Sequence, residues 1–170
     1  VMDHRIFTYV PIPMVLPFPA GLLAGGAAVC GGSVLRHLIG AERGHDIDVF
    51  CWSESRRNRI ATWLESAGWV RTVDPKSSYT GGGGVYTRYL EQTIDLVYHN
   101  EWSSVDDAMS GFDIDVARVY THQGIDFWAA DEGAYDGVMA MEMRLTDKAN
   151  VKTLPRLERY AAMGLRLVPR

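Results

Sequence analysis

The chain has 170 residues, a net charge of −4 and 47% hydrophobic residues. This length is enough for one domain with a hydrophobic core, residues 1–170, and too short for a catalytic domain together with a sizeable recognition domain. The hydrophobic content excludes a disordered chain, and the mildly negative charge disfavours sequence-independent binding along a nucleic-acid backbone. A small ligand, a protein or one end of an RNA remains as partner.

The apolar stretch at residues 9–28 contains prolines at positions 11, 13, 17 and 19. These prolines exclude an uninterrupted membrane helix, and the start is not basic enough for a signal peptide. Cys30 and Cys51 lie in apolar segments without a Cys or His at zinc-site spacing. We expect both to be buried free thiols, although a disulfide between them is not excluded. A cytoplasmic protein without a membrane partner is expected, and the sequence does not indicate its oligomeric state.

The first half of the chain predicts short helices and strands. In chain order they are a helix or turn at 19–25, a strand at 27–30, a helix at 33–39, a polar loop at 40–44, a strand at 46–52 and a helix that ends near residue 67. Ser33 is expected to cap the helix at 33–39. Ser53 or Ser55 is expected to cap the last helix, which Gly68 ends.

The second half predicts mainly strands, with one helix at the end. Strands are expected at 69–73, 85–90, 93–99, 114–121 and 125–129, with a tight turn at 91–92, and helices at 105–110, 131–140 and 154–163. Thr153 is expected to cap the last helix and Gly164 to end it. Because strands and helices do not alternate regularly, the predicted fold class is α+β, with a mixed sheet flanked by helices.

Three aspartates on two predicted strands suggest a metal site. Asp46 and Asp48 are two residues apart on one strand, so they lie on the same face, and their mutual repulsion favours a bound cation. Asp95 is an isolated acid between Ile94 and Leu96. If its strand lies beside the first, the three carboxylates form a site suited to Mg²⁺ or Mn²⁺. Alternatively, the first pair lies on the wet face of a surface strand.

A glycine turn precedes these acids. Gly31 and Gly32 follow a predicted strand and a helix begins near Ser33, so backbone N–H groups and a hydroxyl are available to a phosphate group. The alternative is a simple strand-to-helix turn without a ligand.

Together, the turn and the acids resemble the DNA polymerase beta-like nucleotidyltransferases, including the head region of tRNA CCA-adding enzymes and poly(A) polymerases. The matching residues are Gly31, Gly32, Val34, Arg36, Gly40, Asp46, Asp48 and the later Asp95. The resemblance implies a polymerase beta-like palm fold and a magnesium-dependent transfer of a nucleoside monophosphate from ATP or another NTP. It implies that Asp46, Asp48 and Asp95 are the catalytic and metal-binding residues. It also implies nucleotide binding by Gly31, Gly32, Ser33 and Arg36. The implied acceptor is the end of a tRNA or another RNA, a small molecule or a protein.

A second resemblance, to a viral or phage group of the same superfamily, rests on residues 112–115 and 156–164. It places Arg156 and Arg159 near the triphosphate. The chain departs from CCA-adding enzymes at His37, where those enzymes have an acid, and we expect no RNA-binding tail after the core. A minimal transferase is therefore expected, or alternatively a catalytically inactive nucleotide-binding or regulatory module of the same fold.

Two other motifs are candidate ligand sites. Asp113 and Asp115 repeat the acid–apolar–acid spacing without a preceding glycine turn, and a structural role, in an ion pair with arginine or in a turn, is expected for one of them. The run of glycines at 81–84 predicts a hairpin tip. This tip is placed to close over a substrate, with Lys76, Tyr79 or Arg88 nearby.

Overall fold

The computed structural model describes residues 5–6, 12–41, 46–73, 84–87, 92–98 and 102–169. Within these residues an eight-stranded mixed sheet has the order β1-β8-β7-β2-β3-β6-β5-β4. Its strands, in chain order, are β1 Arg5–Ile6, β2 Ala27–Cys30, β3 Asp46–Cys51, β4 Val70–Val73, β5 Val85–Thr87, β6 Thr93–Val97, β7 Val119–Thr121 and β8 Trp128–Ala129. The predicted α+β class with a mixed sheet flanked by helices is confirmed.

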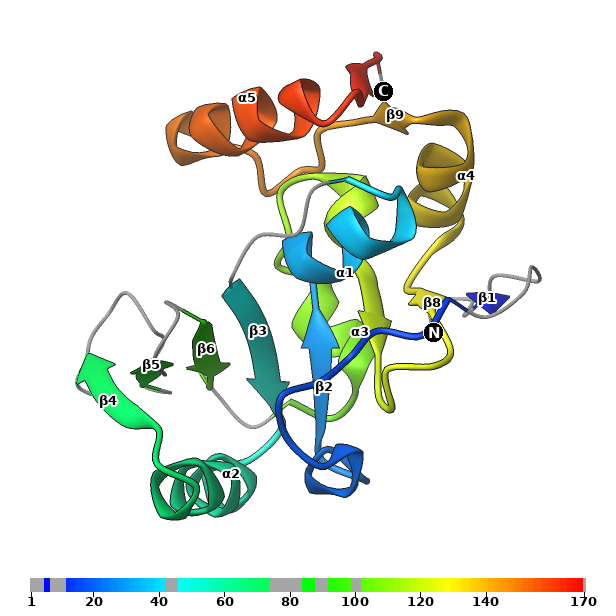
Figure 1. Ribbon diagram of the computed structural model, residues 1–170. Coiled ribbons are helices and arrows are strands. Elements are labelled where there is room, and N and C mark those ends of the chain that lie inside the picture. The colour runs from blue at the N-terminus through cyan, green and yellow to red at the C-terminus, as the bar shows by residue number, and fades with distance from the viewer. Residues whose placement is uncertain are drawn as a thin grey trace.

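Helices lie at both ends of the strands and across the sheet (Figure 1). The helical segments are η1 Ala20–Leu22, α1 Gly32–Leu38, α2 Glu54–Ser66, α3 Val105–Met109, η2 Asp115–Ala117, α4 Glu132–Ala140, η3 Val151–Thr153 and α5 Leu154–Ala162. A small parallel pair joins β9 Glu142–Met143 to β10 Arg166–Leu167. In Figure 1, α1, α4 and α5 lie toward the end at which β3 and β6 begin, and α2 lies at the opposite end.

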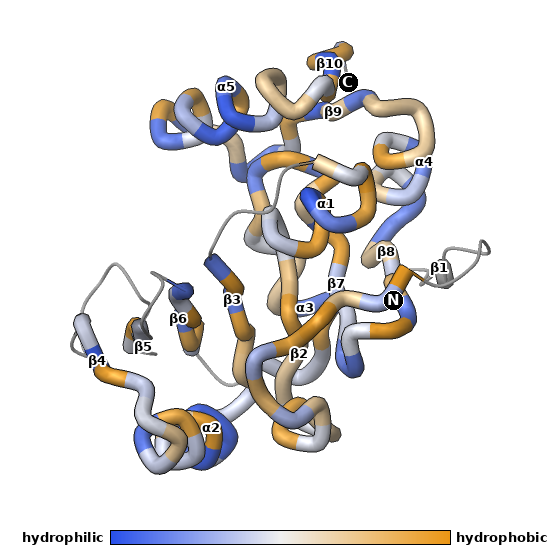
Figure 2. The backbone as a smooth tube through the Cα atoms, viewed as in Figure 1, coloured by the Kyte–Doolittle hydropathy of each residue, from blue (hydrophilic) through white to orange (hydrophobic). Residues whose placement is uncertain are grey.

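The direction of the three central strands positions the site. β2 is antiparallel to β3, and β6 is parallel to β3. The end of β2 therefore lies near the beginnings of β3 and β6, and α1 starts at the same end of the sheet. Figure 2 shows that β3 and β6 are hydrophilic where they begin and hydrophobic further along. One end of a buried sheet thus carries polar groups from three chain segments.

The two faces of the sheet belong to two apolar clusters. On β3, Ile47 and Val49 pack in the main core with Leu35 of α1 and Ile60 of α2. Phe50 points to the other face and packs in a second cluster, which includes residues of α3. This period of two follows from the pleat of a strand, and it places Asp46 and Asp48 on the same face as Phe50.

Most predicted elements are confirmed, with bounds that differ by a few residues. The hydroxyl of Ser53, not that of Ser55, accepts the Arg56 backbone N–H and caps α2. Both cysteines are buried and free, as expected. The predicted residues 42–44, 88–91 and 99 lie outside the described part of the chain, and so do Lys76, Tyr79 and Gly81 to Gly83. No helix within the described residues is long and apolar enough to cross a membrane.

Three predictions of local structure are wrong. Ser33 does not cap α1, because Gly31 has a φ of 79° and the helix begins one residue earlier, at Gly32. Thr153 lies at the start of α5 but makes no capping hydrogen bond, since its hydroxyl accepts the backbone N–H of Asn150 and donates to Asp113 instead. The strand expected at 114–121 is interrupted by η2, because the Asp115 carboxylate accepts two backbone N–H groups and turns the chain.

α4 packs against β9 so closely that Gly137 has no room for a side chain. A Cβ atom there would lie 2.6 Å from the backbone oxygen of Glu142 and 2.6 Å from Cγ1 of Val116. We expect Gly137→Ala to lower the free energy of unfolding by about 1–3 kcal/mol through overpacking, although alanine is the better helix former. Urea denaturation measures this loss. Gly21→Ala is the control, because nothing lies within 4 Å of its added Cβ, and equal losses in both variants would contradict the packing argument.

Candidate active site

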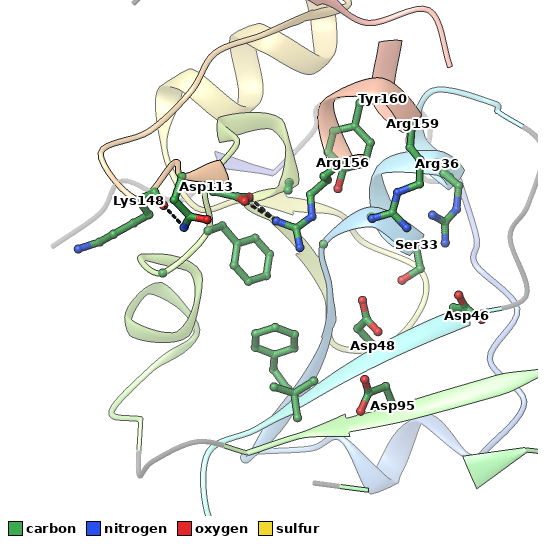
Figure 3. Close-up of a pocket in the computed structure, with 18 residues that line it drawn as sticks. Ser33, Arg36, Asp46, Asp48, Asp95, Asp113, Lys148, Arg156, Arg159 and Tyr160 are labelled. Carbon is green, nitrogen blue, oxygen red and sulfur yellow. Dashed lines mark hydrogen bonds and ion pairs between the residues drawn. The ribbon is translucent and has the colours of Figure 1, made fainter. Parts of the chain in front are cut away.

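Asp48 and Asp95 are direct neighbours on adjacent parallel strands, β3 and β6. Residues paired in this way point to the same face of the sheet. Asp46 lies on that face two residues before Asp48 on β3, beside Thr93, and its side chain is exposed. The sequence predicted that Asp95 joins the other two acids if the strands are neighbours. The strands are neighbours, and Figure 3 shows Asp48 and Asp95 side by side with Asp46 further along the strand.

A cavity of about 460 Å³ opens above these acids. All of the predicted site residues line it, namely Gly31, Gly32, Ser33, Arg36, Asp46, Asp48 and Asp95. Arg156, Arg159 and Tyr160 of α5 form its opposite wall. In Figure 3 these arginines, Arg36 and Ser33 lie across the cavity from Asp48. One end of the cavity is therefore rich in positive charge, and we call Ser33, Arg36, Arg156 and Arg159 the cationic end.

The glycine turn makes room for this arrangement. A Cβ atom on Gly32 would lie 3.2 Å from the Tyr160 hydroxyl and 3.5 Å from Nη1 of Arg36. Ser33 is 8% exposed as a residue, and its hydroxyl oxygen is buried and has no hydrogen-bond partner within the described residues. A buried hydroxyl without a partner is costly, so this group is available to a ligand that enters the cavity.

Burial and mutual repulsion disfavour the charged form of the acid pair. Burial, followed by repulsion from Asp48 and Asp46, raises the pKa of Asp95 to about 7. Burial, followed by repulsion from Asp46, raises the pKa of Asp48 to about 6, although the arginines of the cationic end act in the opposite direction. Oxygen Oδ1 of Asp95 is buried and has no hydrogen-bond partner in the described part of the chain. A cation bound between the two carboxylates would offset both the burial of their charge and their mutual repulsion.

The donor set fits a hard divalent cation, since all three candidate ligands are carboxylates. Among the described residues, however, no three Asp, Glu, His or Cys side chains are close enough together to form a ready-made metal site. Of the three predicted ligands, Asp46 lies apart from Asp48 and Asp95. The structure therefore brings two of the three predicted ligands together, and the three-ligand metal site stays a prediction.

The sequence favoured a structural role for one of Asp113 and Asp115, and in the structure both have such a role. Asp113 is 8% exposed and both of its carboxylate oxygens lie 2.5 Å from Nη1 of Arg156. It also accepts a hydrogen bond of 2.9 Å from the Thr153 hydroxyl. The carboxylate of Asp115 accepts backbone N–H groups from Val116 and Arg144. Asp113 therefore holds α5 and Arg156 against the cavity.

Sequence reasoning did not identify several residues that line the cavity. These are Phe50, Val97, Gly111, Ala117, Lys148, Asn150 and Tyr160. Tyr160 belongs to the segment 156–164, and Phe112 to the segment 112–115, but no ligand role was assigned to either. Residues such as Asn150 belong to no recognisable sequence motif, because they reach the cavity from a loop.

Asp113→Asn tests whether Asp113 positions Arg156. The amide keeps one acceptor oxygen but carries no charge, so one hydrogen bond to the guanidinium is lost and the other is weakened. We expect about tenfold weaker binding of inorganic tripolyphosphate and a loss of about 1–3 kcal/mol in stability. Calorimetry and thermal unfolding measure the two effects. Asp126→Asn, at an exposed acid, is the control. Unchanged binding in a destabilised Asp113→Asn variant would limit Asp113 to a purely structural role.

Comparison with known proteins gives matches to solved structures only. No protein-family model and no curated protein sequence matches the chain. A CCA-adding enzyme in complex with ATP matches with a TM-score of 0.67 and 14% identity, over 99% of this chain and 43% of that one. The chain has the nucleotidyltransferase fold. The fold predicted from the sequence, a polymerase beta-like nucleotidyltransferase fold, is thereby confirmed.

Two further matches are CCA-adding enzymes with known sources. The Thermotoga maritima enzyme complexed with tRNA matches with a TM-score of 0.60 and 13% identity, over 84% of this chain and 35% of that one. The Bacillus stearothermophilus enzyme in complex with CTP has a TM-score of 0.59 and 16% identity, over 88% and 40% of the two chains. The chain thus spans less than half the length of these structures. The likeness to a viral or phage group stays a prediction.

Proposed function

We propose that the protein is a magnesium- or manganese-dependent nucleotidyltransferase that moves a nucleoside monophosphate from an NTP to an acceptor hydroxyl. The observation that carries this proposal is the register of Asp48 with Asp95, opposite the arginines that line the same cavity. Acids beside a cationic end suit a triphosphate, since its reacting phosphorus needs a cation and its leaving pyrophosphate needs positive charge.

The cationic end holds the β- and γ-phosphates. Arg36, Arg156 and Arg159 neutralise them, and the Ser33 hydroxyl donates a hydrogen bond. Asp46, Asp48 and Asp95 would hold the divalent cation, which would supply charge stabilisation at the reacting phosphate. Because Asp113 fixes Arg156, one wall of the site is in position before the nucleotide binds.

Transfer then exchanges one phosphorus–oxygen bond for another. The acceptor hydroxyl oxygen attacks the α-phosphorus, the bond to the β-phosphate oxygen breaks, and pyrophosphate leaves toward the cationic end. Asp95 would help to activate the acceptor, whose proton passes to solvent. Positioning and charge neutralisation account for catalysis, as in other phosphoryl transfers.

Three acceptor classes are compatible with this chemistry. An RNA end is the first choice, because solved structures of the same fold include a CCA-adding enzyme complexed with tRNA. A host protein, as for a toxin-like transferase, and a small molecule are the others. The mildly acidic chain favours recognition of an RNA end rather than of a long backbone.

Labelled NTPs identify the acceptor class. The protein is incubated with each α-labelled NTP, Mg²⁺ and a cell lysate, and RNA, protein and small molecules are then separated. We expect EDTA-sensitive label in one of the three fractions. Tight NTP binding without transfer to any fraction would instead support the catalytically inactive module, and absence of NTP binding would contradict both functions.

A further inference from the structure

The cavity continues beyond the acids to an apolar end. On β3, Phe50 follows Asp48 by two residues, and on β6, Val97 follows Asp95 by two, so all four lie on the same face. Phe112 meets Phe50 edge to face, with ring centres 5.3 Å apart. We call Phe50, Val97 and Phe112 the aromatic end. Phe50 and Val97 therefore lie beyond the acids along β3 and β6, in the same cavity as the cationic end.

The two rings are held in place by neighbours outside the cavity. Phe50 stacks on Trp102 at 5.6 Å between ring centres. The carbonyl of Phe112 accepts hydrogen bonds from the Thr146 hydroxyl, at 2.7 Å, and from Arg118, at 3.2 Å. Phe112 also packs over Gly31, where a Cβ atom would lie 3.2 Å from its ring. A planar ligand would thus meet a surface that is already fixed, and little entropy is lost in ordering it.

The polar side chains around the aromatic end are already engaged by the protein. Asn150 accepts from the Lys152 backbone and donates to the carbonyl of Lys148, at 2.9 Å and 3.2 Å. Asp113 is engaged by Arg156 and Thr153. The other polar side chains beside them are the guanidinium of Arg156, which Asp113 holds, and the long, exposed side chain of Lys148. Fixed donors and acceptors that could read the edge of a base are therefore scarce.

We propose that the aromatic end binds the base of the NTP by stacking, with little discrimination among the four bases. This inference rests on the proposed function. With the β- and γ-phosphates at the cationic end and the α-phosphate at the acids, the nucleoside extends toward Phe50 and Phe112. A cavity of about 460 Å³ is in the range for one small ligand. Every base presents a flat face to an aromatic ring, so stacking tolerates all four.

Calorimetry with Mg²⁺ and non-transferable ligands tests this assignment. The ligands are the α,β-methylene analogues of the four NTPs and inorganic tripolyphosphate, which has no base. We expect the four analogues to bind within about fivefold of one another and more tightly than tripolyphosphate. Phe112→Leu should weaken the analogues about tenfold and leave tripolyphosphate unchanged. Trp63→Leu, at a partly buried aromatic residue of α2, is the control and should change neither.

Each of the other outcomes would contradict one specific part of the proposal. Equal affinity for analogues and tripolyphosphate, with no effect of Phe112→Leu, would place the base elsewhere. A preference for one base above about 50-fold would overturn the lack of discrimination. If Phe112→Leu weakened only a short single-stranded RNA, the occupant would be a base of the acceptor. If neither tripolyphosphate nor any analogue bound, the proposed function itself would fail, which is a different result from a misplaced base.

Discussion

Asp48→Asn should reduce nucleotidyl transfer by a factor of about 10³ or more, because it removes the central carboxylate of the site. Asp48 is the neighbour of Asp95 across the two strands and of Asp46 along β3. No other acid of the described residues occupies that position. Asparagine preserves the shape of the side chain and removes the charge that attracts a cation. Release of pyrophosphate from a labelled NTP measures the loss.

The same substitution should leave the fold intact and stabilise the metal-free protein. Repulsion between these half-buried carboxylates opposes folding, so one neutral amide relieves it. Asp136→Asn is the matched control, since Asp136 is exposed on α4, and it should keep full activity. Transfer at the wild-type rate by Asp48→Asn would refute the assignment of the acids. Loss of transfer in both variants would mean that the loss reflects disruption of the whole protein rather than removal of the site carboxylate.

The elements of the fold were largely predictable because their signals are local. The Ser53 cap and the Gly68 stop define α2 within a short window. The alternation in residues 46–51 likewise defines β3 and the face that its acids share. In each case propensity, turn chemistry and hydrophobic pattern agree.

The errors occur where contacts distant in sequence decide the local structure. Asp115 turns the chain only because the backbone of Arg144 supplies a hydrogen bond from 29 residues away. β9 and β10 have two residues each, and they form because a parallel partner is present. Neither the hydrogen bond from Arg144 nor the pairing of β9 with β10 can be inferred from a short window of sequence.

The candidate site combines both kinds of information. The sequence predicted the three acids and the glycine turn from their types and spacings together with a family resemblance, and the arginines of α5 from a family resemblance alone. It predicted the contact of Asp95 with Asp48 only on the condition that the strands pair. The aromatic end was not predicted, since Phe50 and Val97 look like ordinary core residues of β3 and β6 until the cavity is known.

The metal-free protein should lose stability as the pH rises from about 4 to 8. The pKa values of Asp48 and Asp95 in the folded protein, about 6 and about 7, exceed their usual value. A carboxyl whose folded-state pKa is raised contributes its full stability below its unfolded pKa, and that stability is lost as pH rises through the folded pKa. Because Asp95 is partly exposed and screened by water, we expect a total loss of about 2–3 kcal/mol.

Paired unfolding curves of the wild type and Asp95→Asn in EDTA isolate this effect from other titrating groups. The variant should gain stability relative to the wild type with increasing pH, and most of the gain should fall between pH 5 and pH 8. Millimolar Mg²⁺ should then raise the melting temperature of the wild type at pH 8 more than that of the variant, because a ligand stabilises the state that binds it. Parallel pH profiles, together with equal responses to Mg²⁺, would show that the two carboxylates neither repel each other nor share a cation. The proposed catalytic role of the pair depends on that repulsion, since two half-buried charges that a cation must balance are what would draw the metal and the nucleotide to this end of the sheet.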